Sequence, residues 1–334
     1  MQSVTSIQLL RALSAWMVVG HHYMQFFYNL KSDSALGAFF ATYGNIGVDV
    51  FFIISGFIMV YSLTLKTRTA KQFLIGRISR IVPVYWFYTF LTIVVAQVCV
   101  RLGSYPWTAA SLLKSLFFIP HENPAGLGLY PLLLVGWTLN VEMFFYSVLA
   151  LMMLVLKRYY FAVVAMLFVA LPLVWQEGWV LAPLLDNSRL SEFSIGILFG
   201  MLYCRRNFFE KLKGILIGTV FLGLLFWVYK NNSVYMLQFY ASLLVFCALF
   251  LEKNLNTPYE TYKPLVLLGD MSYSTYLSHV LIIVIFRNYI VEPPTRTGEV
   301  FIIAALTLCI GIVSFISYKY IEKGWFFKVV KQHA

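Results

Sequence analysis

The sequence predicts an all-α integral membrane protein with about ten transmembrane helices and both termini in the cytoplasm. Three observations predict this fold class. Of the 334 residues, 60% are hydrophobic and only 12% are charged, and the mean hydropathy of +0.78 lies far above that of soluble domains. The apolar residues are gathered into unbroken runs, which favour helices over strands. The basic residues are concentrated in alternate connections between these runs.

Ten apolar segments come close to the length that a helix needs to cross the hydrocarbon region. They lie approximately at 7–28, 45–65, 81–101, 131–156, 158–175, 189–204, 212–229, 233–251, 266–290 and 299–321. The first is too long, and too polar at Arg11, to be a cleaved signal peptide. Since no room remains for a separate soluble domain, we expect residues 1–334 to form one transmembrane domain. In the longest connection, 102–130, we expect a short interfacial or re-entrant helix before a proline-rich turn.

The distribution of charge orients these segments. With the N-terminus inside, most of the 25 basic residues fall on the cytoplasmic side. The other side holds the remainder, namely Lys31, Arg101, Lys114, Arg189, Lys230, Arg287 and Arg296. The positive-inside rule therefore places both termini in the cytoplasm. The formal net charge of +11 largely reflects this topology, so we expect the lipid bilayer but no nucleic acid among the partners.

The cysteines give no sign of metal or disulfide chemistry. All four lie in or at the ends of predicted spans: Cys99, Cys204, Cys247 and Cys309. Their spacing fits neither a disulfide framework nor a metal site. We expect them to be packing residues, and we expect no metal.

The first segment carries Arg11 and His22, eleven residues apart. That is about three helical turns, so both side chains project from one face, roughly 16 Å apart along the axis. Ionisable groups are costly in a bilayer and usually line a polar cavity, which makes the pair a candidate catalytic site. The structural alternative is an arginine that snorkels to the lipid surface and a histidine that bonds to a neighbouring helix. His22 snorkels less easily, and this favours the functional interpretation.

The second segment places Asp49 about one turn inside the outer end of its helix. His22 lies near the outer end of its own span, so the two residues reach a similar depth. A carboxylate at this position can hold an imidazole in one tautomer as a catalytic partner. It can also cap the N-terminus of its helix, and the two roles can coexist.

The next cytoplasmic connection ends in Arg77 and Arg80. Their three-residue spacing places both guanidinium groups on one face of a helix start at the inner surface. Guanidinium pairs bind phosphates bidentately, so this is a candidate binding site for a phosphorylated cytosolic donor. Anchoring by the positive-inside rule would also put arginines here, and the spacing does not separate the two roles.

The fourth segment contains Glu142, roughly three turns in from the outer surface and beyond the reach of snorkelling. A carboxylate at that depth usually has a function, so Glu142 is a candidate catalytic residue. Tyr146 shares its face at helical spacing. We expect the neighbouring Trp137 and Asn140 to contact the substrate.

The ninth segment presents Ser272, Tyr276 and His279 at positions i, i+4 and i+7, a polar stripe that runs up from the cytoplasmic end. The tail of a bound donor can lie along such a stripe. Hydrogen bonding between helices is an equally good explanation from spacing alone.

Together these motifs resemble family three of the membrane acyltransferases. The resemblance rests on Arg11 with His22 and on the segments 47–57, 77–80, 137–142 and 272–279, and it runs from about residue 5 to Glu322. Any one motif is weak, but five in the same order are specific. The chain departs from the family pattern in having a second histidine, His21, which can also be read as the motif histidine. The spacing from Arg11 favours His22. The chain is most similar to the exopolysaccharide-production members.

The resemblance implies ten helices, an acyl-CoA donor on the cytoplasmic side and acyl transfer to a sugar hydroxyl. It puts Arg11 and His22 at the catalytic centre, and Arg77 and Arg80 among the donor contacts. We therefore expect a multi-pass O-acyltransferase of the bacterial cytoplasmic membrane that takes acetyl-CoA and acylates a cell-surface glycan or lipid-linked oligosaccharide. His22 would act as general base or as covalent nucleophile. Arg11 would stabilise the charge of CoA or hold Glu142 ionised.

A transporter or flippase for a glycolipid or sugar is the alternative, because it would also combine about ten spans with buried charges. Such a protein should show inverted repeats and paired broken helices. The sequence shows neither. A purely structural membrane subunit would not need four buried ionisable residues. Acyl transfer is therefore the function that the sequence predicts best.

Overall fold

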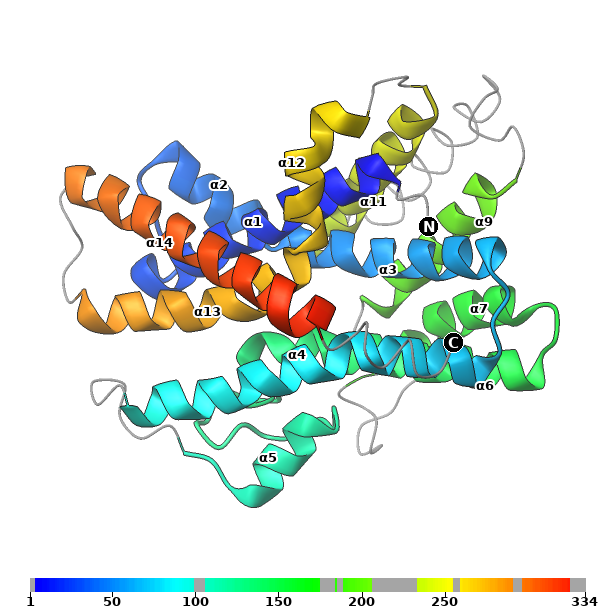
Figure 1. The fold of residues 1–334 in the computed structure, drawn as a ribbon, viewed down its shortest axis with the longest axis horizontal. Coiled ribbons are helices and arrows are strands. Elements are labelled where there is room, and N and C mark those ends of the chain that lie inside the picture. The colour runs from blue at the N-terminus through cyan, green and yellow to red at the C-terminus, as the bar shows by residue number, and fades with distance from the viewer. Residues whose placement is uncertain are drawn as a thin grey trace. The chain divides into compact units, whose positions relative to one another are not determined.

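The computed structural model describes residues 4–98, 106–174, 184, 189–205, 233–254, 259–290 and 296–324. Within these ranges every regular element is a helix, as the sequence predicts (Figure 1). The chain forms two compact units whose segments alternate along the sequence. Unit 1 comprises Met1–Val18, Tyr43–Lys71 and Phe145–Asp270; unit 2 comprises Val19–Thr42, Gln72–Phe144 and Met271–Ala334. Helices α1 and α6 each contribute one end to each unit.

Unit 1 is built on a close pairing of α3 with α9. Its helices are the first part of α1 (Thr5–Tyr28), α3 (Ile46–Leu65), most of α6 (Trp137–Val155), α7 (Tyr160–Val174), α9 (Leu190–Tyr203), α11 (Ser233–Asn254) and α12 (Tyr259–Asp270). Glycines allow the backbones of α3 and α9 to approach closely. A Cβ on Gly56 would collide with the Phe193 carbonyl, and a Cβ on Gly196 would collide with the Ile53 carbonyl. Small residues let helix backbones come this close in membrane proteins.

The core of unit 1 is aliphatic and aromatic. Ile53 and Phe57 of α3 are fully buried, in one cluster with residues of α1, α9 and α11. A second group stacks Phe193 on Phe145, with ring centroids 4.3 Å apart, and on Phe52 at 4.9 Å. This packing fixes the start of α9 against the start of α3, where Asp49, Arg189 and Glu192 lie.

A carboxylate from α11 caps the start of α1 in unit 1. Glu252 accepts hydrogen bonds from the backbone N–H groups of Thr5 and Ser6, at 3.1 and 2.7 Å. The first N–H groups of a helix have no partner within it, and a negative charge there is favourable in the helix dipole. The bond therefore holds the first turn of the helix that carries Arg11.

Unit 2 contains the second half of α1 and α4, the longest of the described helices. Its elements are α2 (Ala35–Tyr43), α4 (Ala70–Val98), α5 (Ala109–Leu116), η2 (Leu134–Gly136), the start of α6, α13 (Ser272–Tyr289), α14 (Arg296–Ser317) and η3 (Tyr318–Glu322). Helices α13 and α14 pack side by side (Figure 1). Helix α1 ends in left-handed Asn29, whose N–H bonds to the Gln25 carbonyl; asparagine tolerates this conformation better than most residues.

A short helix occupies the connection in which the sequence predicts one. Thr108 and Ser111 form a reciprocal capping box at the start of α5. Two residues of α4 bind the C-terminal end of α5: Tyr85 donates to the Ser115 carbonyl at 3.1 Å, and Trp86 donates to the Leu116 carbonyl at 2.9 Å. Leu113 is 55% exposed. Its apolar surface suits the interfacial position expected from the sequence.

Four described helices are long and apolar enough to cross a membrane: Ile46–Leu65, Ala70–Val98, Leu134–Val155 and Gly298–Glu322. A fifth is added if α12 and α13, which are separated at Met271, count as one span. Helix α1 is not among them, because its polar and ionisable side chains lower its hydropathy. The membrane fold class is thus confirmed, while the number ten and the cytoplasmic termini stay predictions. The segment 212–229 lies outside the described residues.

Two predicted boundaries are wrong. Helix α4 begins at Ala70 and not near residue 81, so Arg77 and Arg80 lie within a continuous helix. Apolar runs stop at charged residues, whereas lysine, arginine and glutamine are good helix formers. The predicted span 266–290 is divided at Met271 into two helices, just after Gly269 and Asp270. Neither residue favours a helix interior.

Candidate active site

Two imidazoles meet in unit 2. His22 lies on α1 and His279 lies on α13, and His279 Nε2 is 3.0 Å from His22 Nδ1. The ring centroids are 5.0 Å apart. His279 is fully buried, and its Nδ1 lies 3.2 Å from the carbonyl oxygen of Thr275, one turn back on the same helix. The contact thus joins residues that are 257 positions apart in the sequence.

The hydrogen-bond chain assigns the tautomers of both neutral rings. A carbonyl oxygen can only accept, so His279 Nδ1 must carry the hydrogen that bonds to Thr275. His279 Nε2 is then an acceptor, and His22 Nδ1 must donate to it. This leaves the lone pair of neutral His22 on Nε2. His279 therefore holds His22 in the tautomer that can take a proton or attack a carbonyl through Nε2.

The structure gives His21 a different neighbour. Its Nδ1 lies 3.2 Å from the carbonyl oxygen of Phe40 on α2. The His21 and His22 rings meet edge to face, with centroids 5.7 Å apart. His21 thus joins two helices of unit 2, whereas His22 is the one paired with His279. This difference supports the choice of histidine made from the sequence.

The predicted stripe on α13 is present, and Tyr276 uses it to bind another element. Its hydroxyl donates to the Val135 carbonyl at 3.1 Å and lies 3.0 Å from Thr138 Oγ1. The Tyr276 and His279 ring centroids are 5.8 Å apart. Ser272 is fully buried at the start of α13, and its hydroxyl has no hydrogen-bond partner within the described residues. For Tyr276 the geometry is that of a bridge between helices.

Two of the other residues predicted in unit 2, Arg80 and Glu142, lie near another part of α13. Both Arg80 and Glu142 are close enough to the hydroxyl of Tyr273 for their charges to act on it. That hydroxyl donates to the Ile81 carbonyl of α4 at 2.9 Å. Arg77 and Arg80 are half-buried on α4. Asn140 is buried, while Trp137 at the start of α6 is half-buried.

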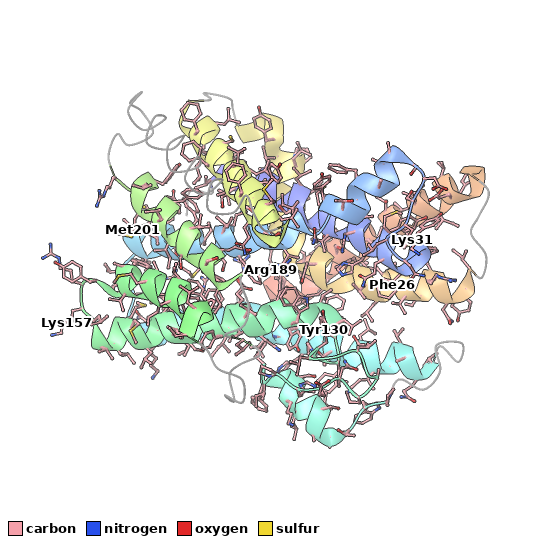
Figure 2. All side chains as sticks on the ribbon, turned by 180° about the vertical axis from the view of Figure 1, so that it is seen from behind. Phe26, Lys31, Tyr130, Lys157, Arg189 and Met201 are labelled. Carbon is pink, nitrogen blue, oxygen red and sulfur yellow. The ribbon has the colours of Figure 1, made fainter. Side chains whose placement is uncertain are left out.

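Asp49 forms an ion pair that the sequence analysis did not anticipate. Within unit 1 its Oδ1 accepts a hydrogen bond from Arg189 Nε at 2.7 Å, an ion pair between α3 and the residue before α9. Arg189 is labelled in Figure 2. Glu192 follows one turn later, fully buried beside Asp49. Neither Glu192 oxygen accepts a hydrogen bond within the described residues. Asp49 lies in the first turn of α3, where the helix dipole also favours its charge.

Arg11, the other predicted residue in unit 1, is half-buried on α1. Its Nη1 donates to Gln8 Oε1 at 3.1 Å, one turn back on the helix. Unit 2 thus holds His22, Arg77, Arg80, Trp137, Asn140, Glu142, Ser272, Tyr276 and His279, and unit 1 holds Arg11 and Asp49.

Sequence reasoning missed several polar partners. Arg189 and Glu192 are spaced by three in an otherwise apolar segment, and the cost of burying a charge could have singled out Glu192. Glu322 accepts a hydrogen bond from Ser274 on α13 at 3.0 Å. No spacing rule relates these two residues, because they are 48 positions apart. Thr138 and Tyr273 were likewise not singled out.

Comparison with known proteins decides the family. The family described as "Acyltransferase domain" matches residues 4–316, which include all the predicted site residues. The chain belongs to acyltransferase family three. It is similar to "Exopolysaccharide production protein ExoZ" of Rhizobium meliloti (strain 1021), with 34% identity over 260 residues that cover 72% of this chain and 77% of the relative. No solved structure matches the chain.

For this acyltransferase, the described residues of unit 2 offer an oriented imidazole and half-buried arginines. In the part of the chain that the structure describes, no three His, Cys, Asp or Glu side chains gather as metal ligands. An imidazole held by a second group can serve as base or nucleophile in acyl transfer.

Proposed function

We propose that this protein is a multi-pass O-acetyltransferase of the bacterial cytoplasmic membrane. It transfers the acetyl group of cytoplasmic acetyl-CoA to a hydroxyl of an exopolysaccharide or of its lipid-linked precursor. Family membership supports acyl transfer, and the name of the Rhizobium relative supports an exopolysaccharide as acceptor. The hydrogen bond between His22 and His279 carries the proposal, because acyl transfer to a hydroxyl needs an oriented base.

The reaction balances with His22 as general base. Nε2 of His22 removes the proton of the sugar hydroxyl while the sugar oxygen attacks the thioester carbonyl carbon. The carbon–sulfur bond breaks, and CoA leaves as a thiolate that takes the proton from His22. The products are an acetyl ester and free CoA. His279 touches neither substrate in this scheme; it positions His22 through Nδ1.

The other predicted residues take supporting roles. Arg77 and Arg80 bind the phosphates of CoA, since each guanidinium group can donate two parallel hydrogen bonds to the oxygens of one phosphate. Arg11 and Glu142 stabilise charge on the donor. Asp49 holds the start of α9 in place through its ion pair with Arg189. Trp137 and Asn140 contact the acceptor. Ser272 and Tyr276 line the path of the donor beside His279.

Transfer of radiolabelled acetyl groups tests the function directly. Full-length protein in lipid nanodiscs is incubated with labelled acetyl-CoA and exopolysaccharide freed of its O-acyl groups by mild alkali. We expect label in the glycan and an equal amount of released CoA. Release of label from the glycan by mild alkali identifies an ester. A glycan that stays unlabelled, with wild-type protein shown to be folded, would overturn the proposal.

A further inference from the structure

The last turns of α1, directly after His22, carry a cluster of aromatic side chains. Tyr23 stacks on Phe27 with ring centroids 4.8 Å apart, and Tyr28 meets Tyr23 at 6.0 Å. Phe26 lies one turn after His22, and their ring centroids are 6.4 Å apart. Phe26 is half-buried (Figure 2). An aromatic surface thus begins within one helical turn of the imidazole that is proposed to act on the acceptor.

Two charged residues of opposite sign hold this end of α1 to α13 and α14. Glu299 Oε1 accepts from the hydroxyls of Tyr28 at 2.8 Å and Tyr23 at 3.4 Å. Arg287 Nε donates to the Phe26 carbonyl at 3.2 Å, and its guanidinium carbon is 5.9 Å from the Phe27 ring centroid. All these residues belong to unit 2.

Each charged residue retains hydrogen-bonding capacity. Within the described residues, the bonds of Glu299 use Oε1, and those of Arg287 use Nε and Nη1, the latter to the Ile290 carbonyl at 2.9 Å. Arg287 is exposed and Glu299 is half-exposed. One carboxylate oxygen and one terminal amino group are therefore left to accept from and donate to a ligand.

This combination fits a neutral polyhydroxylated ligand. A pyranose ring has a face of weakly polarised C–H groups, which suits the electron-rich face of an aromatic side chain. Its hydroxyls both donate and accept, as a carboxylate beside a guanidinium requires. The opposite charges of Glu299 and Arg287 cancel, so the cluster selects neither an anion nor a cation.

We propose that Phe26, Glu299 and Arg287 form a subsite for a sugar residue of the acceptor glycan, next to the residue that is acylated. The inference rests on the proposed function and specifies where the glycan lies relative to His22. Phe26 supplies a stacking face, Glu299 accepts from a sugar hydroxyl, and Arg287 donates to one. Tyr23 and Tyr28 hold Glu299 in place.

Glycan binding without acetyl-CoA tests the subsite separately from catalysis. Full-length protein in nanodiscs is titrated calorimetrically with de-O-acylated oligosaccharides cut from the exopolysaccharide of cells that carry this chain. Phe26→Leu removes the stacking face, while Glu299→Gln keeps an acceptor for Tyr28 but loses the charge. Each change should raise the Kd for the oligosaccharide about tenfold. The Kd for acetyl-CoA should stay the same.

Phe301→Leu is the matched control, because Phe301 is 71% exposed on α14 and lies outside the cluster. Its Kd values should equal those of wild type. Wild-type protein that does not bind the oligosaccharide, or unchanged glycan affinity in both variants, would overturn the subsite. A purely structural role would instead lower the melting temperature of Glu299→Gln and leave its glycan affinity unchanged. Wild-type protein that binds the glycan but transfers no acetyl group would refute the proposed function and leave the subsite standing.

Discussion

His22 and His279 show how one residue depends on another that no spacing rule relates to it. The sequence identifies both histidines, but it assigns His279 to the donor because the stripe on α13 is all that spacing can reveal. Their contact arises from the packing of α1 against α13 and was therefore not predictable from local pattern. Once the contact is known, the carbonyl of Thr275 decides which nitrogen of His22 carries the lone pair.

We expect His22→Ala to abolish acetyl transfer while leaving membrane insertion and folding intact. In the proposed mechanism His22 moves a proton, and His279 cannot replace it because its Nε2 is bonded to His22. His21→Ala should retain at least partial activity, since its ring bonds to the Phe40 carbonyl. Label incorporation into the glycan, with both variants matched for amount and melting temperature, is the measurement. An inactive His21→Ala beside an active His22→Ala would reverse the assignment.

A second expectation concerns His279 as a positioning residue. His279→Ala should lower kcat about a hundredfold or more and leave KM for both substrates unchanged, because a misaligned base weakens only the transition state. His279→Gln, which can still accept from Nδ1 of His22, should recover part of the rate. Steady-state kinetics with varied acetyl-CoA and glycan separate the two constants. A rise in either KM at unchanged kcat would point to substrate binding instead.

The Asp49–Arg189 ion pair leads to a stability prediction. Arg189→Ala leaves a buried carboxylate without its guanidinium partner and should destabilise the protein by about 3–5 kcal/mol. Asp49→Ala alone should also destabilise it, and the double variant should lose less than the sum of the two. Thermal unfolding in detergent gives the double-mutant cycle. Strictly additive losses would show that the two side chains do not interact.

At the scale of elements, glycines explain why α3 and α9 pack so closely. The sequence predicts both helices, with boundaries within about two residues of those observed, because long apolar runs mark them clearly. It does not predict their pairing, although Gly196 and Gly200 have the four-residue spacing that often marks a helix contact. This pairing also explains the ion pair of Asp49, because it brings Arg189 to the carboxylate.

Gly196→Ala should destabilise unit 1 by about 2–3 kcal/mol, since the added methyl meets the Ile53 carbonyl, which is backbone and cannot turn aside. Gly311→Ala in α14 is the matched control, because a Cβ there has no atom within 4 Å. It should be neutral or stabilising by up to about 1 kcal/mol, as expected from helix propensity. Melting temperatures of the two variants measure the difference. Equal melting temperatures would contradict the close packing of α3 on α9.

The position of Arg77 and Arg80 inside α4 also has consequences for the donor. A helix holds the two guanidinium groups at fixed spacing on one face, so less ordering is needed to bind two phosphate groups. The double change to alanine should weaken CoA binding far more than glycan binding, and lysine should restore it only in part. Titration of CoA against purified variants is the measurement. Unchanged affinity would reduce these arginines to topological anchors.

For the whole molecule, composition predicts the class of fold better than the number of spans. High hydropathy and unbroken apolar runs indicate membrane helices, and four of the described helices meet the requirement outright. Helices α7 and α9 and the segment Met236–Glu252 of α11 are apolar, but they are shorter than a full span. In α1 the polar residues that are proposed to act in catalysis lower the hydropathy that would identify the helix as a span. The number of spans therefore cannot be read from the apolar runs alone, because neither helix length nor these polar residues enter such a count.

Topology links this architecture to the proposed chemistry, because acetyl-CoA, the proposed donor, can reach Arg77 and Arg80 only from the cytoplasm. The distribution of charge predicts that the connection 66–69 and the C-terminus lie inside, and that the connection 102–130 lies outside. In a variant without native cysteines, Thr67→Cys and His333→Cys should resist a membrane-impermeant maleimide in intact cells. Leu129→Cys should react, because the Leu129 side chain is 48% exposed. Labelling of Thr67→Cys without permeabilisation would place both arginines on the wrong side for their donor, and would contradict the orientation and the direction of transfer together.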